Sequence, residues 1–326
     1  MLSMKRSLVA SGLLAALVSW AAPSQAQTQT WPQRTVKFIL TLGAGSGTDI
    51  GARLIADRLT KKWRQPVVVE NRPGGDAIVA ISAFVNANDD HVLLASPSSS
   101  FTAHPYLHGN LPYKPSDLLP IVRVSNTIIV IAVPASLNVR SLADVVALAR
   151  KEPGKLNWAG VTGALDFSFA GFLKSNGLTM TKVPYRNPVE AANDLAEGRV
   201  QVYEAALAIV QPQLQSGKIE LLAVTNSVRA PTLPDVPTVK EAGYPELTLD
   251  GLVGYFGPAG MPLELRERIA ADVKAVIAAD PIIPERLNFT GQVLNVGGPA
   301  EFGAAIDEQR ARLAAIAKDL GVKATQ

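Results

Sequence analysis

The sequence predicts an α/β protein with mostly parallel sheets. Strand-like and helix-like segments alternate along most of the chain, which is the pattern that parallel strands and their crossover helices produce. The chain has 326 residues, enough for two domains or one large one. Its hydrophobic fraction of 48% and charged fraction of 18% indicate a well-packed globular protein rather than a disordered one.

The alternation is clearest in the first part of the chain. VKFILTL (36–42) predicts a buried strand. Residues 49–63 predict a helix, because Ala52, Ile55, Leu59 and Trp63 recur at helical spacing. The following segments predict a strand at 66–71, a helix at 78–87 and a strand at 92–96.

The same pattern continues through the middle of the chain. NTIIVIAVP (126–134) is rich in β-branched residues and predicts one strand, and Ser141 is a candidate N-cap for a helix over 141–154. Further strands are predicted at 155–160, 182–185, 200–206 and 219–225, with a helix at 188–197. The Pro-rich segment 229–247 predicts a connecting loop with a short helix, and residues 263–279 and 301–320 predict helices.

The N-terminus predicts a secretory signal peptide. Residues 1–26 have a basic start, an apolar stretch from Leu8 to Ala22 and small residues before a cleavage point after Ala26. The apolar stretch is too short and too interrupted for a membrane anchor. Because residues 1–26 contain two basic residues and no acids, their removal lowers the formal net charge from +3 to +1. We therefore expect a mature protein that is free in the periplasm.

Composition excludes several classes of site. The chain has no cysteine, which excludes disulfides, thiolate metal sites, cysteine nucleophiles and a lipid-modified cysteine. It has no block of lysine and arginine, so we expect no nucleic-acid partner. Its histidines are His91, His104 and His108, and no HExxH or comparable spacing is apparent, so we predict no metal and no cofactor.

The loop between the first strand and the first helix, TLGAGSGTD, is the strongest candidate site. It matches neither a Walker A loop, a dinucleotide fingerprint nor a nucleophile elbow. A glycine-rich loop at a helix N-terminus nevertheless offers free N–H groups and the positive end of the helix dipole to an anion. We predict an anion site at Ser46, Gly47, Thr48 and Asp49, in which Thr48 or Asp49 also caps the helix.

Three more loops follow predicted strands, where ligands bind in open α/β sheets. The first contains Ser98 and Ser99 before His104, a histidine that is either a ligand contact or a surface residue. The others contribute Thr162, Gly163, Ala164 and Asp166, and then Tyr203 and Glu204. Asp166 is predicted to be an N-cap, and Glu204 is either exposed or directed into a cleft. Four such loops without catalytic machinery favour a binding cleft over an active site.

Several segments resemble the extracytoplasmic solute receptors of tripartite tricarboxylate transporters, the Bug proteins. They are WPQRTVKFIL, VVVENRPGG, GKLNWAG, VPYR, LLAVTNSVRAPTLPDVPTVKEAGYPEL and GYFGPAGMP, and the resemblance runs from Trp31 to about Leu320. LPDVPTVKEAGYP (233–245) is especially close to the family pattern.

The resemblance implies a periplasmic-binding-protein fold of two α/β lobes with the ligand between them. The chain would cross between lobes near 125–133 and 250–258, so that residues 27–128 and 254–326 form one lobe and 129–253 the other. The loop at 43–49 and a facing loop in the second lobe would hold a ligand carboxylate. The implied partners are a small organic acid and the membrane subunits of a transporter, and we expect a monomer.

Two residues depart from the family pattern and leave alternatives open. Asp166 stands where a small hydroxyl residue is common, and Glu204 where many members have aspartate. In members that bind amino acids, that acid is expected to meet the ligand's amino group, so an amino-containing acid is an alternative ligand. A sensor for a membrane signalling partner is a second alternative, and a secreted hydrolase using Ser46 or His104 is a third.

Overall fold

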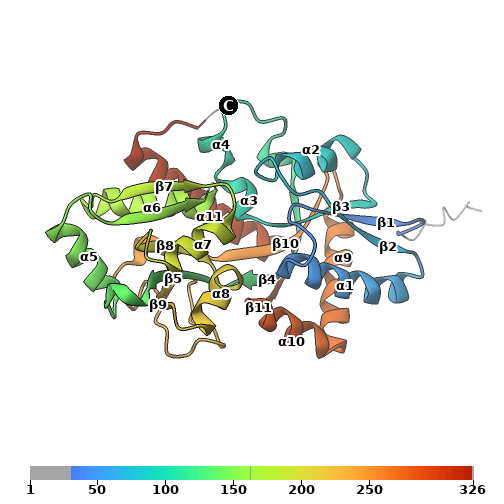
Figure 1. Cartoon of the computed structure of the whole chain (residues 1–326). Coiled ribbons are helices and arrows are strands. Elements are labelled where there is room, and N and C mark those ends of the chain that lie inside the picture. The colour runs from blue at the N-terminus through green and yellow to red at the C-terminus, as the bar shows by residue number, and fades with distance from the viewer. Residues whose placement is uncertain (1–30, 162, 325–326) are drawn as a thin grey trace, which may run out of the picture.

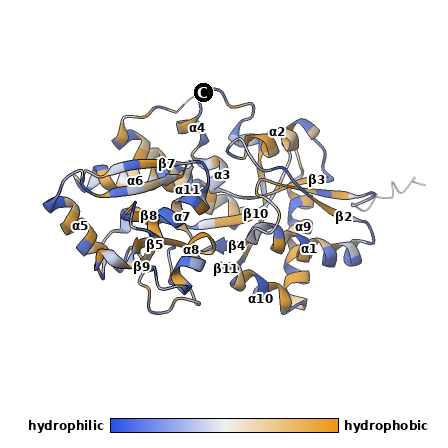
Figure 2. Ribbon diagram, in the orientation of Figure 1, coloured by the Kyte–Doolittle hydropathy of each residue, from blue (hydrophilic) through white to orange (hydrophobic). Residues whose placement is uncertain are grey.

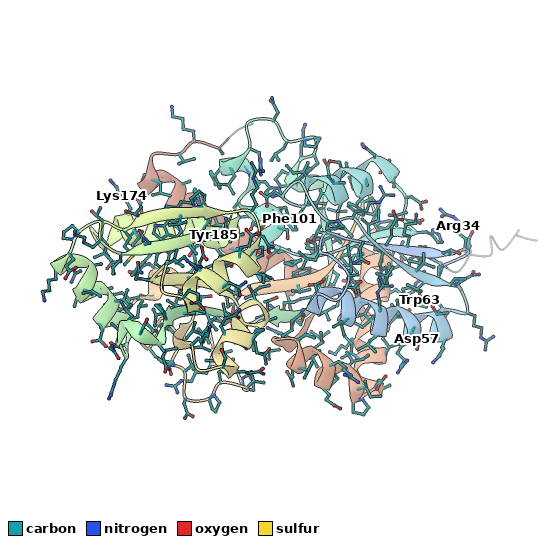
Figure 3. The ribbon with its side chains drawn as sticks, viewed as in Figure 1. Arg34, Asp57, Trp63, Phe101, Lys174 and Tyr185 are labelled. Carbon is teal, nitrogen blue, oxygen red and sulfur yellow. The ribbon has the colours of Figure 1, made fainter. Side chains whose placement is uncertain are left out.

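The computed structural model describes residues 31–161 and 163–324, and the predicted signal peptide lies outside this range. The described chain forms two sheets with helices on both faces of each (Figure 1). In Figure 3, Arg34 lies near one end of the elongated molecule, beside the first sheet, and Lys174 lies on the opposite half, beside the second sheet. We call the part around the first sheet lobe 1 and the part around the second sheet lobe 2.

The sheet of lobe 1 has the strand order β11-β4-β10-β3-β1-β2. Its strands are β1 (Val36–Leu40), β2 (Val67–Asn71), β3 (Val92–Pro97), β4 (Leu119–Thr127), β10 (Gly251–Gly257) and β11 (Gln292–Gly297). Its helices are α1 (Gly47–Trp63), α2 (Ile78–Ala87), α3 (Ser99–Thr102), α4 (His104–Leu107), η1 (Pro115–Asp117), α9 (Leu263–Ala279), α10 (Ile282–Phe289) and α11 (Pro299–Leu320).

Strand β1 shows why this sheet is covered on both faces. Phe38 and Leu40 join a core cluster with α1 and α9, while Ile39 between them joins a cluster with α2 and α11. Successive side chains of a strand point to opposite faces, so a continuous apolar run requires a helix layer on each side. Figure 2 shows hydrophobic residues concentrated in the strands and polar residues on the outer helix surfaces.

The sheet of lobe 2 has the order β7-β6-β8-β5-β9. Its strands are β5 (Ile129–Pro134), β6 (Asn157–Val161), β7 (Thr181–Tyr185), β8 (Val202–Ala206) and β9 (Ile219–Val224). Its helices are η2 (Ala135–Leu137), α5 (Leu142–Lys151), α6 (Ala164–Ser175), α7 (Pro188–Ala196), α8 (Leu207–Gln215) and η3 (Pro245–Leu247). One core cluster lies on the α5 and α6 face and another on the α7 and α8 face.

Both sheets are mixed, so the prediction of mostly parallel sheets was wrong. β1 pairs in parallel with β2 and β3, but β10 is antiparallel to β3 and β4, and β5 is antiparallel to β8 and β9. β10 and β5 are strands by which the chain enters a lobe from the other one, whereas β11, which is also antiparallel to β4, follows α10 within lobe 1. A chain that comes from the other lobe enters a sheet at the edge that faces that lobe. Its first strand there, β5 or β10, therefore runs opposite to the neighbouring strands β8 or β3.

The predicted strand at 126–134 is two strands in two sheets. β4 ends at Thr127 and β5 begins at Ile129, so Ile128 alone joins them. The side chain of Asn226 spans this junction, accepting from the N–H of Ile129 at 3.0 Å and donating to the carbonyl of Thr127 at 2.9 Å. The second predicted crossing, 250–258, falls on β10, which lies wholly in the sheet of lobe 1. The boundary placed between residues 253 and 254 therefore cuts through this strand.

Helix α11 contacts both lobes. Near its start, Phe302 and Ile306 pack in the core of lobe 1 with Phe256. Further along, Leu313 and Ala317 pack with Ala164 and Phe167 of α6, in a cluster that also contains residues of α4. A helix of 22 residues is about 33 Å long, so it spans the junction between the lobes.

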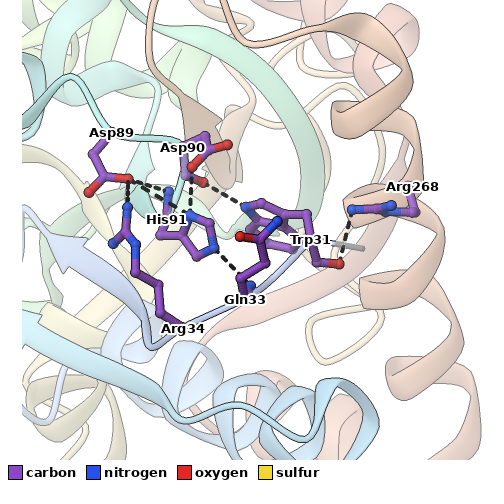
Figure 4. Close-up of polar contacts among 7 residues, drawn as sticks. All are labelled: Trp31, Gln33, Arg34, Asp89, Asp90, His91 and Arg268. Atoms are coloured by element: carbon purple, nitrogen blue, oxygen red, sulfur yellow. Dashed lines mark hydrogen bonds and ion pairs between the residues drawn. The ribbon is translucent and has the colours of Figure 1, made fainter. Parts of the chain in front are cut away.

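The start of the described chain is held against the β3 side of lobe 1 (Figure 4). His91 accepts a hydrogen bond at Nε2 from the N–H of Gln33, and its Nδ1 lies 2.5 Å from Oδ1 of Asp90. Trp31 donates from its indole nitrogen to the carbonyl of Asp90. Arg34 pairs with Asp89 at 2.8 Å. Both ring nitrogens of His91 are thus used in this network.

Candidate functional site

The loop of lobe 1 that precedes α1 is organised around the carboxylate of Asp49. This side chain accepts hydrogen bonds from the N–H of Gly45 at 2.9 Å, from Arg53 at 3.0 Å and from Asn71 at 2.9 Å. Asp49 is 3% exposed. Burial alone raises the pKa of Asp49, but these three donors outweigh it and hold the pKa below its usual value. Asp49 therefore supports the loop from within, and the cap of α1 is Ser46, whose hydroxyl accepts from the N–H of Asp49.

This arrangement leaves backbone donors at the start of α1. Gly47 and Thr48 are the first two residues of the helix, so their N–H groups have no partner within it. The N–H of Ser46, by contrast, donates to the carbonyl of Gly43 at 3.3 Å. A β-carbon at Gly47 would lie 2.4 Å from Nε2 of Gln292 and 3.0 Å from Oγ1 of Thr290, so a larger residue here would have to displace the Gln292 side chain of β11. The anion site predicted at 46–48 thus reduces to the donors of Gly47 and Thr48.

The residues predicted in the next loop of lobe 1 lie deeper than expected. Ser98 is fully buried, and its hydroxyl donates to the side chain of Gln309 on α11 at 2.7 Å. Ser99 is partly exposed at the start of α3. His104 is fully buried, so its interpretation as a surface residue was wrong. Its Nδ1 faces the hydroxyl of Tyr113 rather than any serine.

The loop of lobe 2 leads from β6 into α6. Gly163 is the N-cap residue of α6, with a φ of 128° that favours glycine. The prediction that Asp166 caps this helix was wrong, because its carboxylate instead pairs with Nζ of Lys182 at 2.6 Å. Ala164 is buried against the lobe junction. Thr162 lies outside the described residues.

Lys182 and Asp166 meet over Gly160. A β-carbon at Gly160 would lie 2.4 Å from Cε of Lys182 and 2.5 Å from Oδ1 of Asp166. The glycine therefore gives the space in which β7 and α6 bring the two charges together. Lys182 also lies 5.4 Å from the ring centroid of Trp158, so its cationic head sits against an aromatic face.

Glu204 is the most unusual residue of this region. It lies on β8, is 5% exposed, and neither carboxylate oxygen has a hydrogen-bond partner. Oδ1 of Asp166 is likewise buried without a partner. Burial, together with the nearby charge of Asp166, raises the pKa of Glu204 well above its usual value. Burial also raises the pKa of Asp166, although Lys182 opposes the shift.

Tyr203 lies on the opposite face of the sheet from Glu204. Adjacent residues of a strand point to opposite faces, and Tyr203 packs in the cluster on the α7 and α8 face. Its hydroxyl donates to the carbonyl of Pro188 at 3.4 Å. The structure thus brings together Asp166, Lys182 and Glu204, and it separates Tyr203 from them.

The loop before α1 in lobe 1 (residues 43–49) and the loop before α6 in lobe 2 (residues 160–166) are not joined by hydrogen bonds in the part of the chain that the structure describes. A separate cavity of about 560 Å³ lies where β4, β10 and α11 meet, and none of the predicted site residues lines it. Its walls mix Arg123, Lys240 and Arg312 with Asp250 and Glu308, so cations and acids compensate each other there.

The comparisons with known proteins agree with this architecture. The family model described as "Tripartite tricarboxylate transporter family receptor" matches residues 51–322. The chain belongs to this receptor family. Its relatives include a UPF0065 protein of Bordetella bronchiseptica, which is 29% identical over 313 residues, with 95% of this chain and 93% of that protein covered.

Two solved structures show the same two-lobed fold. The R. palustris protein Rpa4515, solved with adipate, has a TM-score of 0.75 and 28% identity, covering 90% of this receptor and 99% of that chain. The periplasmic binding protein BugD has a TM-score of 0.73 and 26% identity, covering 91% and 100%. The periplasmic-binding-protein fold predicted for the receptor is therefore confirmed.

The sequence did not indicate every residue that shapes this region. Arg53, Asn71 and Lys182 were missed, and each supports a predicted acid. Arg53 lies four residues after Asp49 on the same helix, a spacing at which an ion pair is expected. Asn71 and Lys182 come from neighbouring strands, so only the sheet order reveals them. No helix within the described chain is both long and apolar enough to cross a membrane.

Proposed function

We propose that this receptor works in the periplasm, where it binds a small organic acid between its lobes and delivers it to membrane subunits of a transporter. The observation that carries the proposal is the start of α1, where the N–H groups of Gly47 and Thr48 lack helical partners. These donors and the helix dipole favour a carboxylate. The hydrogen bond from the N–H of Gly45 to Asp49 orders the loop before a ligand binds, which lowers the entropic cost of binding.

The N-terminus of α6 is the second element that would hold the acid. Gly163 and Ala164 open this helix in lobe 2, and its first N–H groups are equally without intrahelical partners. A relative that was solved with adipate, a dicarboxylate, is consistent with one anion-binding helix terminus in each lobe. We expect the signal peptide to be cleaved after Ala26, the mature receptor to be a monomer, and a membrane sensor to be the alternative partner.

Glu204 favours a second ligand class, an acid that also carries an amino group. Its two oxygens and Oδ1 of Asp166 are buried without hydrogen-bond partners. An ammonium group of the ligand would supply donors and a compensating charge to this acidic pair. A plain dicarboxylate would instead require Glu204 to be protonated, and the neutral carboxyl would then donate one hydrogen bond.

A thermal-shift screen of residues 27–326 separates these candidates. The panel contains di- and tricarboxylates, aromatic acids and acidic amino acids. A ligand at 100 times its Kd adds about 2.7 kcal/mol of stability, which raises the unfolding temperature by several degrees. Stabilisation by plain acids supports the carboxylate receptor, stabilisation only by amino acids supports the second class, and stabilisation by none contradicts both.

Variants of Thr48 test the loop itself. Thr48→Pro removes one backbone donor at a helical position where proline is tolerated, whereas Thr48→Ala keeps that donor. We expect Thr48→Pro to lose ligand stabilisation and Thr48→Ala to retain it; equal responses would exclude this donor. Ser46 caps α1 and His104 faces Tyr113, so we also expect no hydrolysis of generic esters by the receptor.

A further inference from the structure

A cluster of two histidines and one carboxylate lies in lobe 1, away from the proposed ligand loops. His104 and His108 bracket one turn of α4, and their rings pack edge to face with the centroids 5.0 Å apart. Asp76 comes from the loop between β2 and α2. Its Oδ2 lies 3.4 Å from Nε2 of His104 and 2.8 Å from Nε2 of His108.

The unusual atom of this cluster is Nε2 of His104. The side chain is fully buried, and this nitrogen makes no hydrogen bond. On the other side of the ring, Nδ1 faces the hydroxyl of Tyr113, which is itself buried. If Nδ1 carries the proton and donates it to Tyr113, the lone pair of Nε2 points toward a carboxylate. In that tautomer the two atoms repel each other, and a cation bound between them would remove the repulsion.

The other histidine group does not have this property. His91 lies with Asp89 and Asp90, which also places three ligand atoms close together. Nε2 of His91, however, accepts from the N–H of Gln33, and Nδ1 faces Asp90 (Figure 4). Both nitrogens of that ring are satisfied by the protein, so the group does not require an ion.

We propose that Asp76, His104 and His108 form a binding site for a divalent transition metal, with Zn²⁺ as the best fit. Two ligands bound at about 2.0 Å in tetrahedral geometry are about 3.3 Å apart. The measured separations of 2.8 and 3.4 Å bracket this value. The single turn of α4 brings the two histidines together, since the N–H of His108 donates to the carbonyl of His104 at 3.0 Å.

The surroundings suit such an ion. The hydroxyl of Tyr113 contacts Nδ1 of His104, and a hydrogen bond to the nitrogen that does not bind the metal is how metal-bound histidines are normally oriented. The side chains of His108 and Asp76 are 27% and 23% exposed, so an ion can enter from solvent and retain a water as its fourth ligand. Asp76 has a φ of 51°, a left-handed conformation that aspartate adopts more readily than most residues.

The site has a structural consequence for the junction between the lobes. α4 also carries Tyr106, which stacks on Phe167 of α6 with the ring centroids 5.6 Å apart. A metal that joins α4 to the loop of Asp76 would therefore fix the lobe 1 side of this contact. It would do so without touching the residues of the carboxylate loop, so loss of metal and loss of the proposed ligand are separable.

Calorimetric titration with Zn²⁺ alone tests the proposal. The protein is prepared without a polyhistidine tag and stripped of metal with a chelator. We expect one equivalent to bind. The Zn²⁺ affinity is expected to fall more than about a hundredfold in His104→Gln, since loss of a residue that only orients a metal ligand costs about 10–100-fold. Tyr113→Phe is expected to fall within that smaller range. His91→Gln is the matched control and is expected to bind Zn²⁺ as the unaltered protein does.

His108→Gln keeps the test decisive if His104→Gln does not fold. His108 is partly exposed, so this change affects the core less, and it is expected to weaken Zn²⁺ binding as strongly. The chain contains three histidines, so proton NMR of their ring signals gives a second readout. Zn²⁺ is expected to shift two of the three. No binding by the unaltered protein, or binding that survives in both His104 and His108 variants, would overturn the proposal.

Discussion

Nζ of Lys182 lies 2.6 Å from Oδ2 of Asp166, while the other oxygen of that carboxylate is buried without a hydrogen-bond partner. Glu204 adds a second acid, whose pKa is raised by burial and by the charge of Asp166. The partly exposed Lys182 therefore pairs with one of two neighbouring acids, and the other, Glu204, is buried with both oxygens lacking a hydrogen-bond partner. This excess of acid over base is expected to make the stability of the receptor depend on pH. A ligand that brings a positive charge to these acids would compensate it.

Glu204→Gln is expected to change the pH dependence of stability. Because the pKa of Glu204 is raised in the folded protein, its contribution to stability is fully present below the unfolded pKa and is lost as pH rises toward the folded pKa. Each fully released proton changes the free energy of unfolding by up to about 1.4 kcal/mol per pH unit. Urea unfolding at pH 4 and pH 8 is expected to show the variant gaining stability relative to the unaltered protein at the higher pH. A constant difference between them would mean that the pKa of Glu204 is the same in the folded and the unfolded protein.

Lys182→Met is expected to destabilise the receptor, because it removes the cation and leaves the acids uncompensated. We expect a loss of about 1–3 kcal/mol at pH 7, the typical cost of leaving a buried polar group unsatisfied. Lys218→Met is the matched control, since Lys218 pairs with Glu197 at 2.8 Å on the surface and such pairs contribute about 0–1 kcal/mol. Equal effects of the two changes in urea unfolding would show that Asp166 does not depend on Lys182.

Asp49→Asn is expected to loosen the loop before α1. The pKa of Asp49 is lowered, so its contribution to stability is present above the unfolded pKa and is lost as pH falls through the folded value. We expect the variant to lose about 1–3 kcal/mol at pH 7, and the difference to shrink below about pH 4. Asp57→Asn on the exposed face of the same helix is the control and is expected to have little effect. A difference that persists unchanged at pH 3 would contradict the role of the charge.

The sequence predicted the elements of lobe 1 up to β3 closely, because their apolar periodicity is local. It did not reveal the break at Ile128, since the run 126–134 is equally β-branched on both sides of the crossing. α10 and β11 were also missed. QVLNVG is short, and Pro284 interrupts the helical pattern of α10.

In the candidate site, too, local features could be predicted from the sequence and features that depend on the sheet order could not. The glycine-rich loop and the donors of Gly47 and Thr48 follow from a strand, a turn and a helix in sequence order, so they could be predicted. The pair of Lys182 with Asp166 depends on β7 lying beside β6, which is a property of the sheet. The spacing of the histidines in HPYLH was visible in the sequence. The spacing alone did not indicate a metal site, because the third proposed ligand, Asp76, is brought near the two histidines only by the fold.

The position of α11 across the junction bears on how the lobes can move. Gly171 of α6 lies so close to α11 that a β-carbon there would be 2.5 Å from Cγ2 of Ile316. The crossing at Ile128 is held by Asn226 and by a hydrogen bond from the N–H of Ile128 to the carbonyl of Gly291 at 2.8 Å, and α11 adds a further connection between the lobes. With α11 seated against α6, any change in the angle between the lobes must slide Ile316 along the groove at Gly171. A movement of the lobes relative to each other would then include a shear between these two packed helices as well as a hinge.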